Sequence, residues 1–371
     1  MTRYFLLIAG SKGWNNYRHQ ADVMALSSLL HTDSTNKVIT MMADDLVHNP
    51  YNPYPGKLFN TNRITNKYNV YNREYIDERN ITLHTMKELM NKNNFTKKDS
   101  VFIYYNNHGA PGLLCSPKNR DPDNPEFFAD DIEEYLQELS HYVGKIMFVI
   151  ESCYSGSVAK YISIPNVFTI AAANSIQSSY SAKWNSKLNT FTTNLFTLNF
   201  LNFINNISNH NRTILDLVNY VSERTLKSTV SAYGDNHFSN SITNYRIEDI
   251  FGNISSIPRD NDNNYELINE NSIDLRTILS NHYSKKMNTI YDIFSKLHYK
   301  SSHDYHEIIF NDYSCFKSVV RTYKQHCSSF SDYDYTYLLP GLADICYHNN
   351  ISTKSITDVI VRVCKRTHYV S

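Results

Sequence analysis

Five short apolar runs, separated by longer amphipathic stretches, are the feature that most constrains the fold of this chain. Each run is bounded by polar or turn residues, which is typical of strands buried on both faces of a parallel sheet. The runs are Tyr4–Ala9, Lys37–Met42, Val101–Asn106, Lys145–Ile150 and Asn166–Ala172. Because helical stretches alternate with these strands, the pattern predicts a three-layer α/β domain with a mainly parallel sheet.

Three of the other stretches have the character of helices. In His19–Leu30 the apolar residues fall near helical spacing. Asp130–Leu139 begins with acidic residues, which the helix dipole favours, and Asn194–Ile204 is apolar nearly all round, as in a buried helix. In sheets of this kind ligands bind at the carboxyl ends of the strands, so a functional site is expected there.

A polar segment divides the chain. Residues 256–272 are rich in Asn and Asp and are typical of an exposed linker. From Ile273 onward the pattern becomes helical, and a chain of 371 residues is long enough for two domains. We therefore expect an α/β domain at 1–255 and a helical domain at 273–371.

Charge and composition exclude several classes of function. Lys and Arg balance Asp and Glu at 36 each, which gives no reason to expect a nucleic acid or a membrane surface as partner. No apolar run approaches the ~20 residues of a membrane span, and Tyr4–Ala9 is too short for the core of a signal peptide. Neither zinc-ligand spacing nor a phosphate-binding glycine loop occurs, so no metal or cofactor is expected.

Four of the six cysteines cluster near the end of the chain: Cys315, Cys327, Cys346 and Cys364. An even cluster in a small terminal unit favours two disulfides and an oxidising compartment. The alternative is four buried thiols in a cytosolic helical domain. Spacing alone does not decide between the two.

Polar residues that could take part in catalysis follow two of the predicted strands. The third run leads into Asn107-His108-Gly109, and the fourth into Glu151-Ser152-Cys153. A cysteine at a strand end, followed by a helix and near an imidazole, is a candidate nucleophile with His108 as its base. The backbone N–H of Gly109 could approach a substrate carbonyl closely, as an oxyanion donor does. The alternative is a structural thiol and a strand-end histidine.

Several motifs extend this pattern along the chain, in the order Ala9–Trp14, Asn16–Asp22, Met41–Asp45, Asn52–Gly56, His108-Gly109 and Glu151–Ser157. Together they resemble the legumain family, the asparaginyl endopeptidases of the caspase-like cysteine peptidase clan. The resemblance spans essentially the whole chain, because the four-cysteine tail also matches. It implies a caspase-like α/β/α sandwich followed by an all-α prodomain.

The resemblance implies a triad-like set of catalytic residues. Cys153 would attack the scissile carbonyl, and His108 would protonate the leaving amine. Asn16 would orient the imidazole, the role of the third group in a triad. Taken alone, Asn16 is a turn residue after the first strand.

The resemblance also implies a pocket for asparagine at the P1 position, the residue before the cleaved bond. An asparagine side chain offers one acceptor and two donors, and the pocket would meet it with Arg18 as donor and Glu151 as acceptor. Protonated aspartic acid mimics asparagine, so cleavage after Asp at acidic pH is an expected secondary activity. Taken singly, Arg18 and Glu151 are a surface charge and a strand-end carboxylate. The remaining pocket residues would be His19, Ser178, Ser179 and Asn189.

Two positions depart from the family pattern. Asn189 stands where the family has a pocket aspartate, which puts strict preference for Asn in doubt. Asn107 stands where an acidic residue often precedes the catalytic histidine, which leaves peptide ligation open.

For the C-terminal part the resemblance implies a zymogen. It pairs Cys315 with Cys346 and Cys327 with Cys364, and each bridge would contribute roughly 3–4 kcal/mol by loop entropy. The prodomain would cap the active site of the precursor and act as its inhibitor. Activation would follow cleavage in the linker, where the candidate residues are Asn261, Asn263, Asn264, Asn269 and Asn271.

The expected partners are peptide and protein substrates, the chain's own prodomain and cystatin-type inhibitors. Family members are secreted or reside in endolysosomes or vacuoles, and six glycosylation sequons are compatible with that. One alternative is the catalytic subunit of a GPI-anchor transamidase, which usually carries a C-terminal membrane span, or a peptide ligase. A non-catalytic homologue is a further alternative, which the intact Cys153, His108 and Asn16 disfavour.

Overall fold

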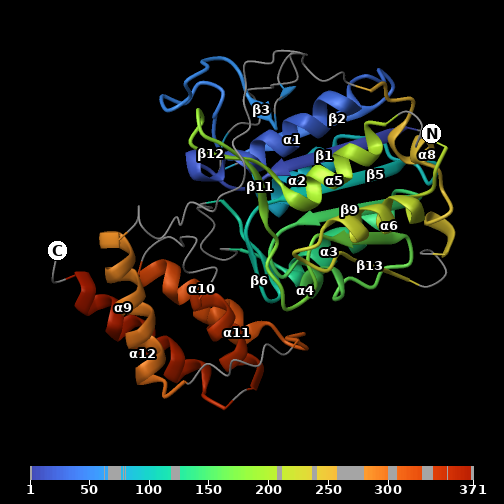
Figure 1. The fold of residues 1–371 in the computed structure, drawn as a ribbon. Helices are drawn as coiled ribbons and strands as arrows, with labels where there is room; N and C mark the ends of the chain where they lie inside the picture. The colour runs from blue at the N-terminus through green and yellow to red at the C-terminus, as the bar shows by residue number, and fades with distance from the viewer. Residues whose placement is uncertain are drawn as a thin grey trace.

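An α/β part and a group of C-terminal helices make up the chain (Figure 1). The computed structural model describes residues 2–61, 63–65, 77, 79, 81–117, 126–206, 211–235, 240–256, 280–299, 307–327, 337–348 and 350–368. Nearly all of the expected linker at 256–272 therefore lies outside the described residues.

A six-stranded sheet forms the centre of the α/β part, in the order β13-β10-β9-β5-β1-β2. Neighbouring strands are parallel except β10 and β13, which are antiparallel. The prediction of a mainly parallel sheet is thus confirmed, and the five apolar runs form its five parallel strands. The strands are β1 Arg3–Ala9, β2 Lys37–Met42, β5 Ser100–Asn106, β9 Lys145–Glu151, β10 Val167–Ala171 and β13 Ser231–Gly234.

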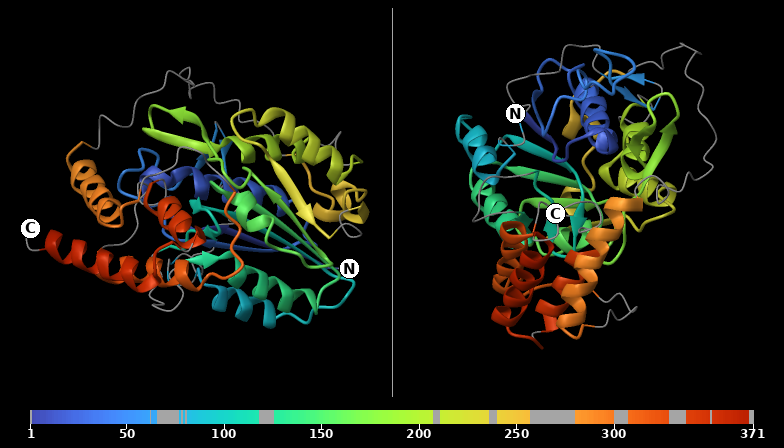
Figure 2. Two further views of the ribbon diagram at one scale, coloured as in Figure 1. Left: turned by 90° about the horizontal axis from the view of Figure 1, so that it is seen from below. Right: turned by 90° about the vertical axis from the view of Figure 1, so that its left-hand side faces the viewer.

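Both faces of the sheet are buried, because successive side chains of a strand point to opposite sides. In β1, Leu6 and Ile8 face one apolar core, whereas Phe5 and Leu7 face the other. Helices on the two faces complete three layers (Figures 1 and 2). The helices are α1 Tyr17–Leu30, α5 Leu195–Ile204, α6 Ile214–Arg224 and α8 Ile247–Phe251 on the second face, and α2 Leu83–Asn91, α3 Ala129–Ser140 and α4 Ser155–Ala159 on the first.

Several short strands form small additional sheets beside the six-stranded sheet. They were not expected from the sequence. They are β3 Phe59–Asn60 with β4 Arg63–Ile64, β6 Gly109–Ala110 with β7 Leu113–Leu114 and β8 Phe127–Phe128, and β11 Ser181–Asn185 with β12 Thr190–Asn194. A 3-10 turn, η1 Trp14–Asn16, precedes α1.

The C-terminal part is helical within its described residues, as expected. Its helices are α9 Ser280–Lys296, α10 Ser314–His326, α11 Leu339–His348 and α12 Thr353–His368. Disulfides join Cys315 to Cys346 and Cys327 to Cys364, the same pairs that the family resemblance implies. Figure 1 shows these helices beside α4 and β6, and their buried residues continue the first apolar core of the sheet.

Aromatic packing joins α10 to the small β6–β8 sheet. The ring centroid of Phe128 lies 6.1 Å from that of Tyr313 and 5.7 Å from that of Phe316. Gly112 has a positive φ of 74°, and a Cβ atom there would lie 2.9 Å from the Tyr313 hydroxyl and 3.2 Å from the ring of Phe310. A side chain at this position would therefore be strained and would also push the C-terminal part away.

Candidate active site

The register of two neighbouring strands brings His108 and Cys153 to the same edge of the sheet. In the β5–β9 pair, Asn106 lies opposite Glu151. His108 and Cys153 each follow two residues later, and adjacent strands are ~4.8 Å apart. The loops stay in contact beyond the strands, because a Cβ atom on Gly109 would collide with the backbone carbonyl of Cys153.

Cys153 is a half-buried free thiol in the turn between β9 and α4. The next residue, Tyr154, has a left-handed backbone with φ 55° and ψ 17°, which turns the chain sharply into the helix. The Cys153 Sγ donates to the backbone carbonyl of Ser179 at 3.8 Å. Burial raises the pKa of the Cys153 thiol, so the neutral thiol prevails at neutral pH in this state.

The amide of Asn16 holds the imidazole of His108. The Nε2 of His108 lies 2.9 Å from the Oδ1 of Asn16, and the Nδ2 of Asn16 donates to the carbonyl of Lys12 at 3.0 Å. Because Nδ2 must donate to that carbonyl, Oδ1 is the atom that faces the ring. The ring nitrogen Nε2 therefore carries the proton, and Nδ1 remains as the basic nitrogen.

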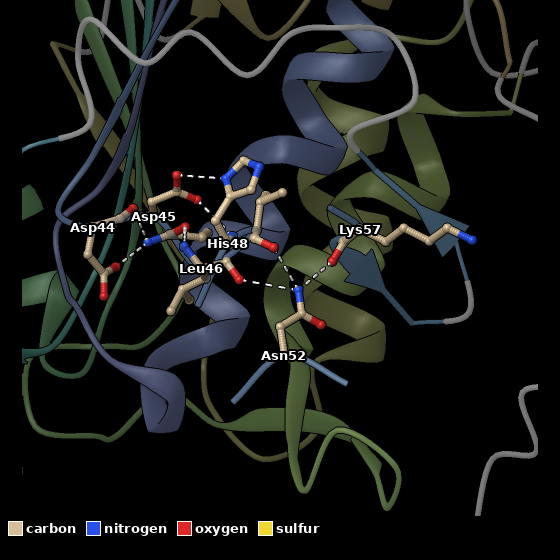
Figure 3. A network of polar contacts seen from close by, with 8 residues as sticks. Asp44, Asp45, Leu46, His48, Asn52 and Lys57 are labelled. Carbon is tan, nitrogen blue, oxygen red and sulfur yellow. Dashed lines mark hydrogen bonds and ion pairs between the residues drawn. The ribbon is translucent and has the colours of Figure 1, made fainter. Parts of the chain in front are cut away.

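The loop after β2 supports the segment that carries Asn16. Asp44 accepts a hydrogen bond from the backbone N–H of Gly13 at 2.8 Å and also contacts the side-chain amide of Gln20. Figure 3 shows polar contacts within the loop after β2, where the side-chain amide of Asn52 donates to three of the loop's backbone carbonyls. These contacts join the Asp44 and Asn52 motifs to the segment that precedes Asn16.

Arg18 and Glu151, the two residues expected to bind a P1 asparagine, both act electrostatically on the thiol of Cys153. The guanidinium of Arg18 donates from Nε to Asn194 Oδ1 at 3.0 Å and from Nη1 to the carbonyl of Asn15 at 2.9 Å. Glu151 is buried, and its carboxyl accepts from Ser179 and from the Thr197 hydroxyl at 3.0 Å. Burial raises the pKa of Glu151 to about 8.

His19 is buried and packs against the imidazole of His108. Its ring centroid is 5.3 Å from that of His108, and its Nδ1 lies 2.5 Å from the hydroxyl of Ser11. Burial, and then the charges of Arg18 and His108, lower the pKa of His19 well below its usual value. A neutral His19 can thus lie close to the guanidinium of Arg18 without adding a second positive charge.

The prediction for Asn189 is wrong. Asn189 is exposed in the turn between β11 and β12, with a φ of 50°. Asn194, at the other end of β12, is the residue that contacts Arg18. Five residues of extended chain separate the two by roughly 16 Å, so Asn189 is not part of the pocket.

Asn107 faces the protein interior. Its Nδ2 donates to the carbonyl of Cys115 at 2.5 Å, and its Oδ1 accepts from the backbone N–H of His108 at 2.7 Å. It therefore fixes the backbone of His108, and its side chain is buried.

Sequence reasoning missed the buried polar residues behind Arg18 and Glu151. These buried residues connect the two side chains by a chain of hydrogen bonds that runs through Asn194, Asp22, Asn106, Tyr104 and Thr197. One signal for them was present in the sequence, namely polar residues within apolar segments. Asp22 lies inside a largely apolar helix, and Asn106 ends an apolar strand.

Several expectations concern other parts of the chain. The candidate cleavage residues Asn261, Asn263, Asn264, Asn269 and Asn271 lie outside the described residues. Among the residues that the structure describes, no three or more His, Cys, Asp or Glu side chains are grouped to hold a metal ion. In the same residues, no helix is long and apolar enough to cross a membrane.

Comparison with known proteins gives two family matches. Residues 3–248 match the Peptidase C13 family, and residues 274–364 match the legumain prodomain. A hemoglobinase of Schistosoma mansoni is 34% identical over 252 residues, which cover 63% of this chain and 56% of that protein. The vacuolar-processing enzyme beta-isozyme 1 of Oryza sativa subsp. indica is 26% identical over 98% of this chain and 85% of its own length. Caspase-1 of Spodoptera frugiperda superposes with a TM-score of 0.39 at 11% identity, covering 63% of this chain and 85% of that one.

Proposed function

The chain belongs to the Peptidase C13 (legumain) family of cysteine endopeptidases, and on that premise we propose that it cleaves peptide bonds after asparagine. Cys153 is the nucleophile, His108 the general acid and base, and Asn16 the group that orients the imidazole. The observation that carries this proposal is the pairing of Asn106 with Glu151, which makes His108 and Cys153 neighbours at one sheet edge.

The chemistry follows from these positions. As the Cys153 sulfur attacks the carbonyl carbon of the scissile bond, its proton passes to His108. The backbone N–H of Gly109 donates to the oxyanion that forms. His108 then protonates the leaving amine, and a water molecule hydrolyses the thioester to release the acid and restore the thiol.

P1 recognition uses one hydrogen-bond donor and one acceptor. The Arg18 guanidinium donates to the side-chain carbonyl of asparagine, and the Glu151 carboxyl accepts from its amide. The side chains of His19, Ser178 and Ser179 line the pocket. A protonated aspartic acid presents the same pattern, so cleavage after Asp at acidic pH is a secondary activity of the same pocket.

We further propose that the helical part, residues 273–371, is an autoinhibitory prodomain joined by an activation linker at 256–272. Its contacts support this role. Glu307 forms an ion pair with Lys160 at 2.7 Å and also hydrogen-bonds Ser175, close to the pocket segment at Ser178. Tyr313 packs against Gly112, three residues after the oxyanion donor.

Acid favours release of this prodomain through Glu307. The hydrogen bond from Lys160, followed by that from Ser175, lowers the pKa of Glu307 below its usual value of 4.5. A lowered carboxyl pKa means that the contact is fully present above 4.5 and is lost as the pH falls through the lowered value. An endolysosomal or vacuolar compartment would supply such acidity.

Cleavage of an Ala-Ala-Asn fluorogenic peptide tests the proposal. Protein incubated at about pH 4, where Asp and Glu carboxylates protonate, is expected to shorten and then to release the fluorophore. Cys153→Ala should abolish this activity. Arg18→Ala should abolish cleavage at Asn and leave the fold intact by circular dichroism. Activity that survives Cys153→Ala would refute the assignment of the nucleophile.

A further inference from the structure

A buried carboxylate lies behind the proposed P1 pocket. Asp22 stands one turn after Arg18 on α1, and residues four apart share a face of a helix. The side chain of Asp22 is fully buried. Isolated buried carboxylates are costly, so its surroundings need to compensate the charge.

Five hydrogen bonds reach the two oxygens of Asp22. The Oδ1 atom accepts from Asn60 Nδ2 at 2.7 Å and from the Thr193 hydroxyl at 2.6 Å. The Oδ2 atom accepts from Asn106 Nδ2 at 3.1 Å, and from the backbone N–H and the Nδ2 of Asn194, both at 3.0 Å. In this arrangement all five groups donate, which satisfies a carboxylate without a hydrogen of its own, and burial opposes that form by raising the pKa of Asp22 to about 7.

Asp22 determines which way the amide of Asn194 points. The Nδ2 of Asn194 donates both to Asp22 and to the Oδ1 of Asn106, the latter at 3.0 Å. The Oδ1 of Asn194 is therefore left facing Arg18, whose Nε donates to it at 3.0 Å. If the amide were reversed, two donors would face each other across the Arg18 contact.

A second path leads from Asp22 to the other side of the pocket. Asn106 Nδ2 also donates to the hydroxyl of Tyr104 at 3.0 Å, which lies 2.5 Å from the hydroxyl of Thr197. Thr197 donates its only hydroxyl hydrogen to Glu151, so Tyr104 must donate to Thr197. Each hydrogen bond between the two carboxyl groups then has one direction.

We propose that Asp22 is a positioning residue for P1 recognition. Through Asn194 it holds the guanidinium of Arg18, and through Asn106, Tyr104 and Thr197 it fixes the hydrogen bonds of Glu151. This role rests on the proposed function, in which Arg18 and Glu151 bind the P1 asparagine.

The variant Asp22→Asn tests it in protein that is produced as the full chain and then activated in acid. An asparagine has the same shape, but its amide directs hydrogens at groups that are themselves donors. The KM for the Ala-Ala-Asn peptide should rise about tenfold or more, as for the loss of a hydrogen bond to a charged group, with kcat less affected. The rate at which iodoacetamide alkylates Cys153 should not change.

A second variant separates positioning from a loss of folding. Asn194→Ala leaves Asp22 in place and removes the group through which it acts on Arg18, so KM should rise as in Asp22→Asn. The double variant should add little to either single change. A matched control is Asp99→Asn, because Asp99 is a buried carboxylate at the opposite end of β5, where it accepts from Thr2 and Thr96.

The outcomes distinguish this inference from the proposed function. A wild-type protein that does not cleave after Asn overturns both. A wild type that cleaves after Asn, together with an unchanged KM in Asp22→Asn, overturns the role of Asp22 alone. If Asp22→Asn does not fold, an unchanged KM in Asn194→Ala has the same meaning.

Discussion

The side-chain amide of Asn16 is the residue-scale feature on which the orientation of the imidazole depends. Its two ends are used by different partners, the Lys12 carbonyl and the His108 ring. A hydroxyl or an aliphatic group could not reproduce both contacts. In the proposed mechanism this amide keeps the basic nitrogen of His108 available.

We predict that Asn16→Ala lowers kcat by about tenfold to a hundredfold, a part of what general acid–base catalysis contributes. KM for the Ala-Ala-Asn peptide should change little, because Asn16 lies outside the P1 pocket. Steady-state kinetics measure both constants. Asn15→Ala is the control, since Asn15 is exposed and contacts Arg18 through its backbone only; an equal loss of kcat in both variants would contradict the role of Asn16.

Glu151 gives a pH-dependent prediction. Its pKa of about 8 means that the carboxyl is neutral in acid and ionises as the pH rises through that value. Glutamine is close in shape to the neutral form, so Glu151→Gln should retain kcat/KM within a few-fold at pH 6 and diverge from the wild type above about pH 8. A pH profile of both proteins is the measurement, and a complete loss of activity at pH 6 would show that the neutral form is not the functional one.

At the scale of elements, the parallel neighbours β5 and β9 bring the proposed catalytic pair, His108 and Cys153, together. The sequence predicted both strands to within a residue, since buried strands are continuous apolar runs. It did not predict that they are adjacent, because strand order depends on contacts between distant parts of the chain. The hairpin β11–β12 was missed for a local reason, because its short strands SAKWN and TFTTN are too polar to stand out as apolar runs. Asn189 lies in the turn between them.

The disulfides of the C-terminal helices give a prediction at this scale. Cys315–Cys346 and Cys327–Cys364 span 31 and 37 residues. Replacing either pair by alanine should lower the free energy of unfolding of these helices by about 3–4 kcal/mol. Urea unfolding followed by limited proteolysis of the C-terminal part measures this. Unfolding at the same urea concentration as the wild type would count against a structural role for the bridges.

At the scale of the whole molecule, lysines of α10 face carboxylates of the α/β part. Lys324 lies 2.6 Å from Glu126, whose side chain is fully buried, and Lys317 lies 2.7 Å from both Asp130 and Asp131. Burial raises the pKa of Glu126, and Lys324 opposes this effect. Loss of the lysine would leave a buried charge without its cation.

We therefore predict that Lys324→Met weakens the contact between the prodomain and the α/β part at neutral pH. Breaking one partner of a buried ion pair should reduce the free energy of this contact by about 3–5 kcal/mol. Because the pKa of Glu126 would rise further without Lys324, this cost is present above that pKa and disappears as the pH falls through it. Gel electrophoresis should detect shortening of the variant at pH 7. Lys354→Met is the control, since Lys354 pairs with Asp358 on its own helix; identical processing of both variants would contradict the prediction.

Both disulfides join helices of the C-terminal part to one another. Once a bond between the two parts is cut, the fragments are separate molecules that associate through apolar packing and ion pairs. Their association then obeys the law of mass action. After cleavage of the linker, the fraction of inhibited enzyme would depend on protein concentration. Dilution alone would then dissociate the prodomain and raise the activity.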